Sequence, residues 1–287
     1  MPISGTTRML GLIGTPVAHS KSPAMYNYCF QKFGLDWAYL AFDVPQEKAA
    51  EAVAAIRTLN LRGANVTMPC KNAVIPYLDE LSPAAKAIQA VNTIVNENGR
   101  LIGHNTDGCG YTQNLHRNGI EVAGKKIVLL GGGGAASAIA IQAALEGAAE
   151  IAVFNLKDAF WPRVEKGLAA IAQAAPNCKI SLHDLEDQKT LKAAIGRCDI
   201  LSNATRVGMA PYEDQSNITD LSWFRPDLVV TDVVYAPPAT RMLREARAAG
   251  CRTCDGLGML LCQGAEAFRL YSGLEMPVEE IRALLYT

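Results

Sequence analysis

The sequence lacks an excess of charge of either sign. Its 27 Lys and Arg residues nearly balance 28 Asp and Glu residues, which leaves a net charge of −1 over 287 residues. A chain with this balance has no overall field that would attract nucleic acid or an anionic membrane surface. We therefore expect a small-molecule substrate, no nucleic-acid or membrane partner, and a monomer or homodimer.

The sequence also lacks the patterns of a secretory leader and of a membrane span. Residues 1–14 contain no basic segment followed by a long apolar core, so we expect no secretory signal. The longest apolar stretch, residues 127–145, is interrupted by four consecutive glycines and by Gln142, which favours a strand, a turn and a helix over a membrane span. We expect a cytoplasmic protein.

Neither the eight cysteines nor the four histidines have the spacing of a metal site. Cys251 and Cys254 form a CxxC pair, but no second pair or nearby histidine completes a set of ligands. A strand at this place would also turn alternate side chains to opposite faces. We expect no metal ion, and we expect reduced thiols because a chain of this length is stable without disulfides.

What the sequence does contain is a run of glycines between a short apolar strand pattern and an alanine-rich helix pattern, KIVLLGGGGAAS at residues 126–137. Without side chains in the way, backbone amides can approach a pyrophosphate closely, and the N-terminus of a helix favours an anion. The pattern therefore predicts a dinucleotide site at Gly131, Gly133 and Gly134, with a flexible turn as the alternative.

The apolar pattern at residues 150–155 predicts the next strand, and Asp158 follows its end. In dinucleotide-binding folds an acidic residue about 20 positions after the glycines binds the hydroxyls of the adenosine ribose. Asp158 fits this role, and an ordinary solvated loop carboxylate is the alternative.

Strand and helix patterns alternate along the chain, which predicts two α/β domains. In the first domain, strands and helices are expected at 8–14, 23–33, 38–44, 47–59, 63–67, 91–95 and 101–104. Asn98 and Gly99 predict a hairpin turn between the last two strands. Helical patterns at 259–268 and 278–286 are left over at the end of the chain, and we expect them to return to this domain.

The second domain begins with a helical pattern at 108–118. Its six strands are expected at 127–130, 151–154, 179–182, 199–203, 228–233 and 251–253. We thus predict an N-terminal, mainly parallel α/β substrate domain at 1–106 and 257–287. A doubly wound, Rossmann-type dinucleotide-binding domain is predicted at 107–256.

Two serines lie at the start of the helix expected at residues 23–33. Ser22 followed by Pro23 is typical of an N-cap with proline at the first helical position. The cap does not need Ser20, so two hydroxyls beside a helix N-terminus predict a site for a carboxylate.

Lys71 follows Pro69 and opens a short helical segment, where the positive end of the helix dipole disfavours an ammonium group. A lysine that exchanges its proton readily can act as a general acid and base, which hydride transfer to or from a carbinol requires. Asp107 either caps the helix that begins near Gly108 or faces Lys71 as an orienting partner. In the second case Asn92 would supply a neutral amide for a substrate hydroxyl.

Eight short segments occur together and in order across nearly the whole chain: SKSP at 20–23, NVTMPCK at 65–71, VNT at 91–93, NTDG at 105–108, GGGGA at 131–135, NAT at 203–205, DVVYAP at 232–237 and GMLLCQGAE at 258–266. They resemble the shikimate dehydrogenase family, and most of all its quinate/shikimate dehydrogenase branch. The resemblance implies an oxidoreductase of aromatic amino acid biosynthesis that reversibly oxidises a ring hydroxyl of shikimate or quinate to the 3-dehydro ketone. The hydride would pass to NAD or NADP.

The resemblance also implies roles for individual residues. Lys71 and Asp107 would form the catalytic acid/base pair. The substrate would be bound by Ser20, Ser22 and Tyr39 around its carboxylate, and by Thr67, Asn92, Thr106, Tyr235 and Gln263 around its hydroxyls and ring. The cofactor would be bound by Gly131, Gly132, Gly133, Gly134, Ala135, Asn155, Lys157, Asp158, Thr205, Arg206, Val233 and Gly256.

The choice of cofactor is expected to depend on the residues after the strand at 150–155. Members of the family that use NADP commonly have arginine where this chain has Leu156, and the carboxylate of Asp158 would repel a 2′-phosphate. We therefore expect NAD to be favoured, with NADP as the alternative because of Lys157 and Arg206.

Two other functions fit the same pattern. One is a related enzyme that acts on another ring hydroxy acid, such as aminoshikimate. The other is a ligand sensor without catalysis, which would be expected to lack Lys71 or Asp107. Both residues are present, so we favour an enzyme.

Overall fold

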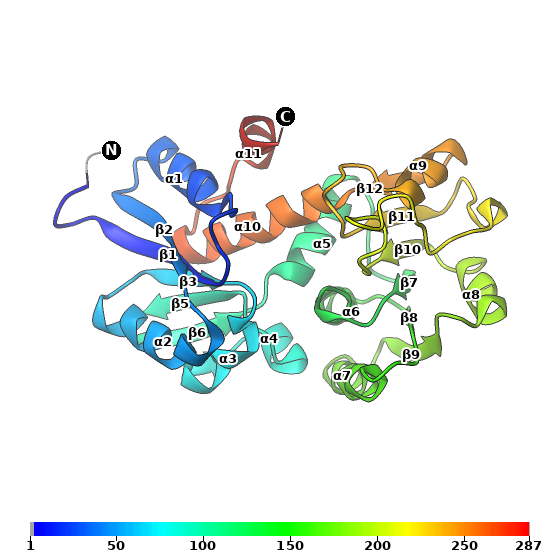
Figure 1. Ribbon diagram of the computed structural model, residues 1–287, viewed down its shortest axis with the longest axis horizontal. Coiled ribbons are helices and arrows are strands. Elements are labelled where there is room, and N and C mark those ends of the chain that lie inside the picture. The colour runs from blue at the N-terminus through cyan, green and yellow to red at the C-terminus, as the bar shows by residue number, and fades with distance from the viewer. Residues whose placement is uncertain (1–2, 287) are drawn as a thin grey trace. The chain divides into compact units, whose positions relative to one another are not determined.

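The computed structural model describes residues 3–286, which form two compact units with one six-stranded sheet each (Figure 1). Unit 1 contains the chain up to Thr106 and again from Gln263 onward, and unit 2 contains the residues between them. The second crossing lies inside a helix, whereas the sequence-based boundary at 257 lies near the beginning of that helix.

Unit 1 alternates strands and helices, as its sequence pattern predicts. Its elements are β1 (Arg8–Gly14), α1 (Ser22–Lys32), β2 (Trp37–Asp43), η1 (Gln46–Lys48), α2 (Ala49–Thr58), β3 (Gly63–Val66), α3 (Cys70–Ala73), η2 (Ile75–Tyr77), β4 (Glu80–Leu81), α4 (Pro83–Ile88), β5 (Thr93–Glu97), β6 (Arg100–His104), the second half of α10 (Gly256–Ser272), and α11 (Val278–Leu285).

The sheet of unit 1 has the order β2-β1-β3-β5-β6-β4. β5 runs antiparallel to both of its neighbours, and the other three pairs are parallel, so the sheet is mixed with parallel pairs in the majority. The hairpin predicted between β5 and β6 is confirmed. Asn98 and Gly99 both have positive φ angles, 55° and 95°, as a two-residue turn of this kind requires.

The two faces of this sheet are covered by different kinds of side chain. α2 covers one face with aliphatic residues such as Val53 and Ile56. On the other face, Tyr26 of α1 stacks on Tyr39 of β2 with ring centroids 4.6 Å apart, and Phe268 of α10 packs beside it. The C-terminal helices therefore return to the first sheet, as predicted (Figure 1).

Unit 2 is doubly wound. Its elements are α5 (Asp107–Arg117), β7 (Lys126–Leu130), α6 (Gly134–Leu145), β8 (Glu150–Asn155), α7 (Trp161–Ala174), β9 (Lys179–Asp184), α8 (Gln188–Ile195), β10 (Ile200–Asn203), η3 (Leu221–Trp223), β11 (Val229–Asp232), α9 (Arg241–Ala248) and β12 (Arg252–Cys254).

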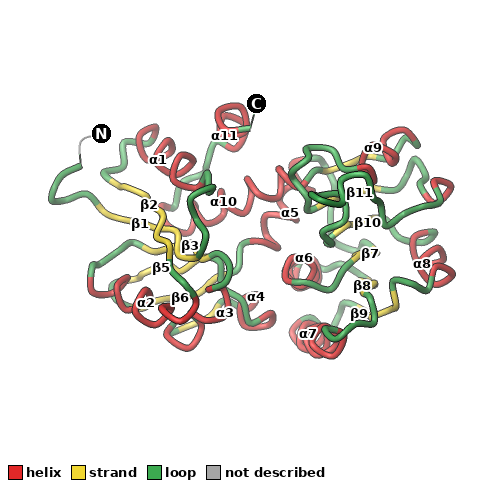
Figure 2. Tube along the Cα trace, in the orientation of Figure 1, coloured by secondary structure: helices red, strands yellow, loops and turns green. Residues whose placement is uncertain are grey.

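All strand pairs of unit 2 are parallel, in the order β12-β11-β10-β7-β8-β9. Numbered within the unit, this is 6-5-4-1-2-3, the strand order of dinucleotide-binding sheets. Helices lie on both faces of the sheet (Figure 2), which explains why the central strands are apolar along their length. Because the strand order reverses between β7 and β10, a ligand-binding crevice is expected at the carboxyl ends of these two strands.

Candidate active site

Ser20 and Ser22 lie at the start of α1, but their hydrogen bonds at the helix N-terminus differ from those predicted from the sequence. The helix begins at Ser22, its N-cap residue is Lys21, and no side chain caps it from that position. The Oγ of Ser20 instead accepts a hydrogen bond of 3.2 Å from the backbone N–H of Ser22. The prediction that Ser22 caps the helix is therefore wrong, because the chain places its amide, rather than its hydroxyl, in the capping interaction.

Lys71 lies in the one-turn helix α3, directly after β3, and its side chain is partly buried. The backbone of this turn is fixed on both sides. The N–H of Cys70 donates to the carbonyl of Thr67 at 2.9 Å, and the N–H of Val91 donates to the carbonyl of Lys71 at 2.9 Å. The second bond places the lysine segment beside the segment that contains Asn92.

A buried network of hydrogen bonds surrounds Asn65, a residue for which the sequence pattern predicts no role. Its Oδ1 accepts from the hydroxyl of Tyr39 at 2.9 Å, and its Nδ2 donates to the carbonyl of Asn92 and to Thr93 Oγ1 at 3.3 and 3.2 Å. Thr93 is also the register partner of Asn65 on the neighbouring strand. A polar residue in a four-residue strand that is buried throughout is the sequence signal that could have identified it.

The network continues to the end of unit 1 through Asn92 and Thr106. Asn92 Oδ1 accepts from the N–H of Thr106 at 2.9 Å and from Thr93 Oγ1 at 3.0 Å, while Asn92 Nδ2 donates to Thr106 Oγ1 at 3.0 Å. Thr106 Oγ1 lies 3.4 Å from the Oε1 of Gln263. The structure therefore brings together three of the predicted substrate-binding residues.

Asp107 follows Thr106 directly and is the first residue of α5. It therefore lies inside the helix rather than at the cap position, and its charge in the first turn is favourable to the helix dipole. Chain connectivity holds it next to the Asn92 network. Its pairing with Lys71 stays a prediction.

Tyr39 is completely buried, with no side-chain surface exposed. Burial raises the pKa of its hydroxyl well above the ordinary value, and a hydrogen bond with Ser22 partly opposes this shift. The phenol therefore stays protonated and donates to Asn65 Oδ1. Its predicted place at the substrate carboxylate stays a prediction.

In the glycine turn after β7, some positions have no room for a side chain and others have open space around them. Gly131 has a φ of +98°, and a Cβ on it would lie 2.9 Å from Thr205 Cγ2, so only glycine fits without strain. A Cβ on Gly132 would lie 2.6 Å from Val164. A Cβ on Gly133 or Gly134 would meet no protein atom within 4 Å.

The N-terminus of α6 lies at this open side. Gly133 is its N-cap residue, and no side chain makes a capping hydrogen bond to the helix there. Exposed glycines and an uncapped helix N-terminus form a cradle for an anionic group. The turn therefore fits the pyrophosphate of a dinucleotide.

The residues after β8 make more bonds within the protein than the sequence predicts. Asn155 Oδ1 accepts from the N–H of Gly132 at 2.9 Å, so this side chain holds the glycine turn. Asp158 Oδ1 accepts from the N–H of Phe160 at 2.9 Å and supports the turn into α7. The Nζ of Lys157 lies 5.5 Å from the ring centroid of Trp161. The Asp158 carboxylate is exposed, and its contact with a ribose stays a prediction.

The carboxyl ends of β10, β11 and β12 carry the remaining predicted cofactor residues. Thr205 is tied to Asn203 by a hydrogen bond of 2.6 Å, while Arg206 is exposed. The N–H of Val233 donates to the carbonyl of Asn203 at 3.0 Å, and a Cβ on Gly256 would lie 2.4 Å from the carbonyl oxygen of Val233. Position 256 therefore has no room for a side chain. Tyr235 is 48% exposed in the loop after β11.

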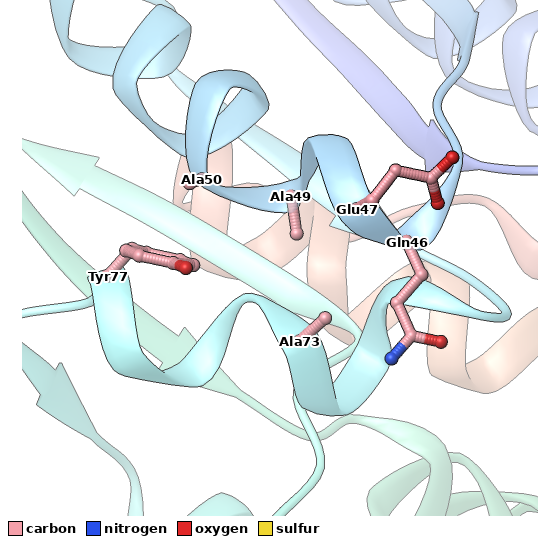
Figure 3. Close-up of a pocket in the computed structure, with 6 residues that line it drawn as sticks. All are labelled: Gln46, Glu47, Ala49, Ala50, Ala73 and Tyr77. Carbon is pink, nitrogen blue, oxygen red and sulfur yellow. The ribbon is translucent and has the colours of Figure 1, made fainter.

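A separate pocket of about 350 Å³ lies in unit 1, and its lining comes from Gln46, Glu47, Ala49, Ala50, Ala73 and Tyr77 (Figure 3). It contains none of the predicted substrate or cofactor residues. Within residues 3–286, no cluster of His, Cys, Asp or Glu side chains is arranged to hold a metal ion. Over the same residues, no helix is both long and apolar enough to cross a membrane.

Comparison with known proteins agrees with this arrangement. Residues 12–94 match the shikimate dehydrogenase substrate binding domain, and residues 256–286 match the shikimate 5'-dehydrogenase C-terminal domain. The chain is 50% identical over 287 residues to shikimate dehydrogenase (NADP(+)) of Streptococcus uberis, covering 99% of this chain and 97% of the relative. It is 48% identical over 284 residues to the enzyme of the same name from Listeria innocua, again covering 99% and 97%.

A solved structure is similar over the entire chain. The shikimate 5-dehydrogenase of Listeria monocytogenes, crystallised in complex with shikimate and NAD, superposes with a TM-score of 0.97 at 47% identity and covers 100% of this chain and 99% of that one. The chain belongs to the shikimate dehydrogenase family. The fold and the enzyme class predicted from the sequence, an NAD(P)-dependent oxidoreductase, are confirmed. The named relatives do not support the narrower assignment to the quinate branch.

Proposed function

We propose that this enzyme reversibly oxidises one ring hydroxyl of shikimate to the ketone of 3-dehydroshikimate, with NAD(P) as the hydride acceptor. The observation that carries the proposal is the buried network that fixes Asn92 and Thr106 beside the Lys71 segment and directly before Asp107. The relatives named above are shikimate dehydrogenases, which supports shikimate as the first substrate to test.

In this proposal Lys71 and Asp107 share the proton chemistry. Lys71 Nζ accepts the proton of the substrate hydroxyl as the ketone forms, and returns it in the reverse direction. A positioned acid or base of this kind contributes roughly 10²–10⁴-fold to the rate. Asp107 orients the ammonium form and stabilises its charge.

The other side chains of unit 1 recognise the substrate. Ser20 and Ser22 donate hydrogen bonds to its carboxylate. Asn92, Thr106 and Gln263 bind the ring hydroxyls, and the hydrogen bonds that join these three residues limit their movement. Thr67 of unit 1 and Tyr235 of unit 2 complete the set.

The cofactor is proposed to bind at the carboxyl ends of β7 and β10. When bound, NAD(P) supplies the hydride acceptor. The open glycines of the turn and the uncapped N-terminus of α6 would bind its pyrophosphate. The residues after β8 would bind the adenosine, and the loops after β10 and β11 would bind the nicotinamide half.

We further propose that NAD is preferred over NADP. An exposed carboxylate at Asp158 and an aliphatic side chain at Leu156 offer a 2′-phosphate one repulsive group and no arginine. Against this stand Lys157 and Arg206, and the two curated relatives named above are NADP(+) enzymes. Replacing Asp158 with Ser and Leu156 with Arg should shift the preference toward NADP.

One set of initial rates tests the proposed substrate and the proposed cofactor preference. Shikimate, quinate and aminoshikimate would each be assayed as substrates against NAD and NADP. The proposal requires the highest kcat/KM with shikimate, and with NAD rather than NADP. A highest value with quinate or aminoshikimate would assign the related activity, and binding without turnover of any of these acids would point to a sensor. An NADP preference of about tenfold or more, equivalent to about 1.4 kcal/mol, would show that Lys157 and Arg206 dominate.

A further inference from the structure

Asn203 and Asp232 are the last residues of β10 and β11 and are register partners on these parallel strands. They lie at the carboxyl edge of the sheet, next to the point where the strand order reverses. Their side chains are only 2% and 3% exposed, and Asn203 Nδ2 donates to Asp232 Oδ1 at 2.9 Å. Neither residue can therefore touch a ligand directly, yet both lie beneath the loops that would.

Asn203 organises the loop that follows β10. Its Oδ1 accepts from Thr205 Oγ1 at 2.6 Å and from the N–H of Thr205 at 3.1 Å. Its Nδ2 donates to the carbonyl of Val207 at 3.0 Å, and Asn217 donates to its Oδ1 at 3.1 Å from a more distant part of the loop. One side chain thus holds both ends of the segment that contains Arg206.

Asp232 organises the loop that follows β11. Its Oδ1 accepts from the N–H of Val234 at 2.9 Å, and its Oδ2 accepts from Thr240 Oγ1 at 2.7 Å. Thr240 is the N-cap residue of α9 and accepts from the N–H of Leu243. The segment with Tyr235 is therefore held at its beginning and at its end by one carboxyl group.

The two loops also contact each other and the glycine turn. A Cβ on Gly208 would lie 2.9 Å from Thr240 Cγ2, and a Cβ on Gly131 would lie 2.9 Å from Thr205 Cγ2. The Asn203–Asp232 pair therefore supports one continuous surface made by the ends of β7, β10 and β11. In a doubly wound sheet the first three strands bind the adenosine half of a dinucleotide and the second three bind the other half.

We propose that Asn203 and Asp232 are positioning residues for the nicotinamide half of the cofactor, because they fix the loops at 204–208 and 233–240 in the conformation that receives it. The inference rests on the proposed function insofar as the cofactor is NAD(P). It assigns these residues a selective effect, so that their loss weakens binding of the nicotinamide half while binding of the adenosine half is retained.

The test compares NAD with ADP, which has the adenosine and diphosphate but no nicotinamide. Dissociation constants of both would be measured by calorimetry for the parent enzyme and for Asp232→Ala. We expect the constant for NAD to rise at least about tenfold and the constant for ADP to change less than about twofold. Asp232→Asn should restore NAD binding to within about threefold, because its amide oxygen still accepts from Asn203 and Val234.

Thr231→Val is the matched control for a loss of stability. Thr231 is buried in the same strand, and its hydroxyl lies 3.2 Å from that of Tyr111, away from both loops. This variant should lower the midpoint of thermal unfolding and leave both dissociation constants unchanged. If Asp232→Ala does not fold, Thr240→Val removes one bond to the same carboxyl group, and Thr240→Ser serves as its control.

Equal weakening of NAD and ADP, or no weakening of either, would overturn the inference and leave the pair a purely structural role. A parent enzyme that binds neither nucleotide would overturn the proposed cofactor and this inference with it. A parent enzyme that binds NAD but does not oxidise shikimate would overturn the proposed substrate alone, and the comparison of NAD with ADP would still decide the role of the pair.

Discussion

Several polar side chains of unit 1 are held in place by hydrogen bonds within the protein before any substrate binds. Asn92 uses its amide oxygen and nitrogen on Thr93 and Thr106, so little freedom is left for it to adapt to a ligand. A group fixed in this way loses little entropy when a substrate binds. The chemistry can then depend on one mobile proton carrier, for which Lys71 is our candidate.

Replacing Lys71 with Ala should lower kcat by about three orders of magnitude or more, because the proton transfer loses its positioned base. The dissociation constant for NAD should stay at the parent value, since the predicted cofactor residues lie in unit 2. Steady-state kinetics and calorimetry measure the two quantities. Lys86→Ala, at an exposed lysine in α4, is the control and should match the parent. A Lys71→Ala variant within about tenfold of the parent would refute the assignment.

The structure changes which serine gives the cleaner test of carboxylate binding. Ser20 accepts the N–H of Ser22, so Ser20→Ala disturbs the helix start. The hydroxyl of Ser22 has no capping role, and within the protein Ser22→Ala removes its hydrogen bond with Tyr39. We expect Ser22→Ala to raise the KM for shikimate by about 10- to 150-fold, as loss of a hydrogen bond to a charged group worth about 1.5–3 kcal/mol implies. The value of kcat should change much less. An unchanged KM would exclude Ser22 from the site.

At the scale of elements, the turn between β7 and α6 contains one glycine that the fold needs and another that only ligand binding is expected to need. Gly131→Ala forces a side chain into a left-handed conformation against Thr205 and should cost about 1–3 kcal/mol of unfolding free energy. Gly133→Ala has an ordinary φ of −75° and meets no protein atom, so stability should stay within about 0.5 kcal/mol. Its methyl group should nevertheless weaken NAD binding. Urea unfolding and calorimetry separate these effects, and unchanged NAD affinity in Gly133→Ala would place the pyrophosphate elsewhere.

The buried carboxyl group of Asp232, at the end of β11, should make the stability of the protein depend on pH. Burial raises the pKa of this carboxyl from 3.8 to about 6, and hydrogen bonds from Val234, Thr240 and Asn203 only partly oppose the shift. Folding therefore takes up a proton. The stabilisation is complete below about pH 3.8 and is lost as the pH rises through about 6.

Asp232→Asn cannot ionise and should remove this dependence. Relative to the parent, its unfolding free energy should rise by up to about 3 kcal/mol between about pH 4 and pH 7. Urea unfolding across that range measures the difference. Parallel pH profiles for the two proteins would show that the carboxyl has an ordinary pKa in the folded state.

Regular elements could be predicted from the sequence, but the partners of polar groups could not. Short apolar runs define β7, β8 and β10, because a strand that is buried on both faces is apolar along most of its length. The two-residue strand β4 and the helix α4 were missed because such short segments show no period. The strand expected at 91–95 begins at Thr93, and the backbone N–H of Val91 donates to the carbonyl of Lys71 rather than to a neighbouring strand.

The same difference applies to the candidate site. Lys71, Asp107 and the glycines stand in local motifs, so the sequence indicates them. Asn65 and Asp232 acquire their roles from side chains that folding brings close, such as Tyr39 and Thr240, and local pattern does not encode those contacts.

At the scale of the whole molecule, the two predicted ligands are assigned to different units. The segments predicted to bind shikimate lie mainly in unit 1, and those predicted to bind NAD lie in unit 2. The net charge of −1 gives neither ligand a general attraction to the surface. Each ligand should therefore stabilise local structure only where its own contacts form.

Hydrogen exchange followed by mass spectrometry can map these contacts. NAD alone should slow exchange most at residues 133–137, 204–208 and 233–240. Shikimate alone should slow exchange most at residues 65–71 and 92–106, because its contacts order these segments. In Lys71→Ala the effect of NAD should persist, which separates loss of catalysis from loss of the cofactor site. Equal protection of both sets of segments by either ligand alone would contradict the assignment of one ligand to each unit. Protection by NAD confined to residues 65–71 and 92–106 would reverse it.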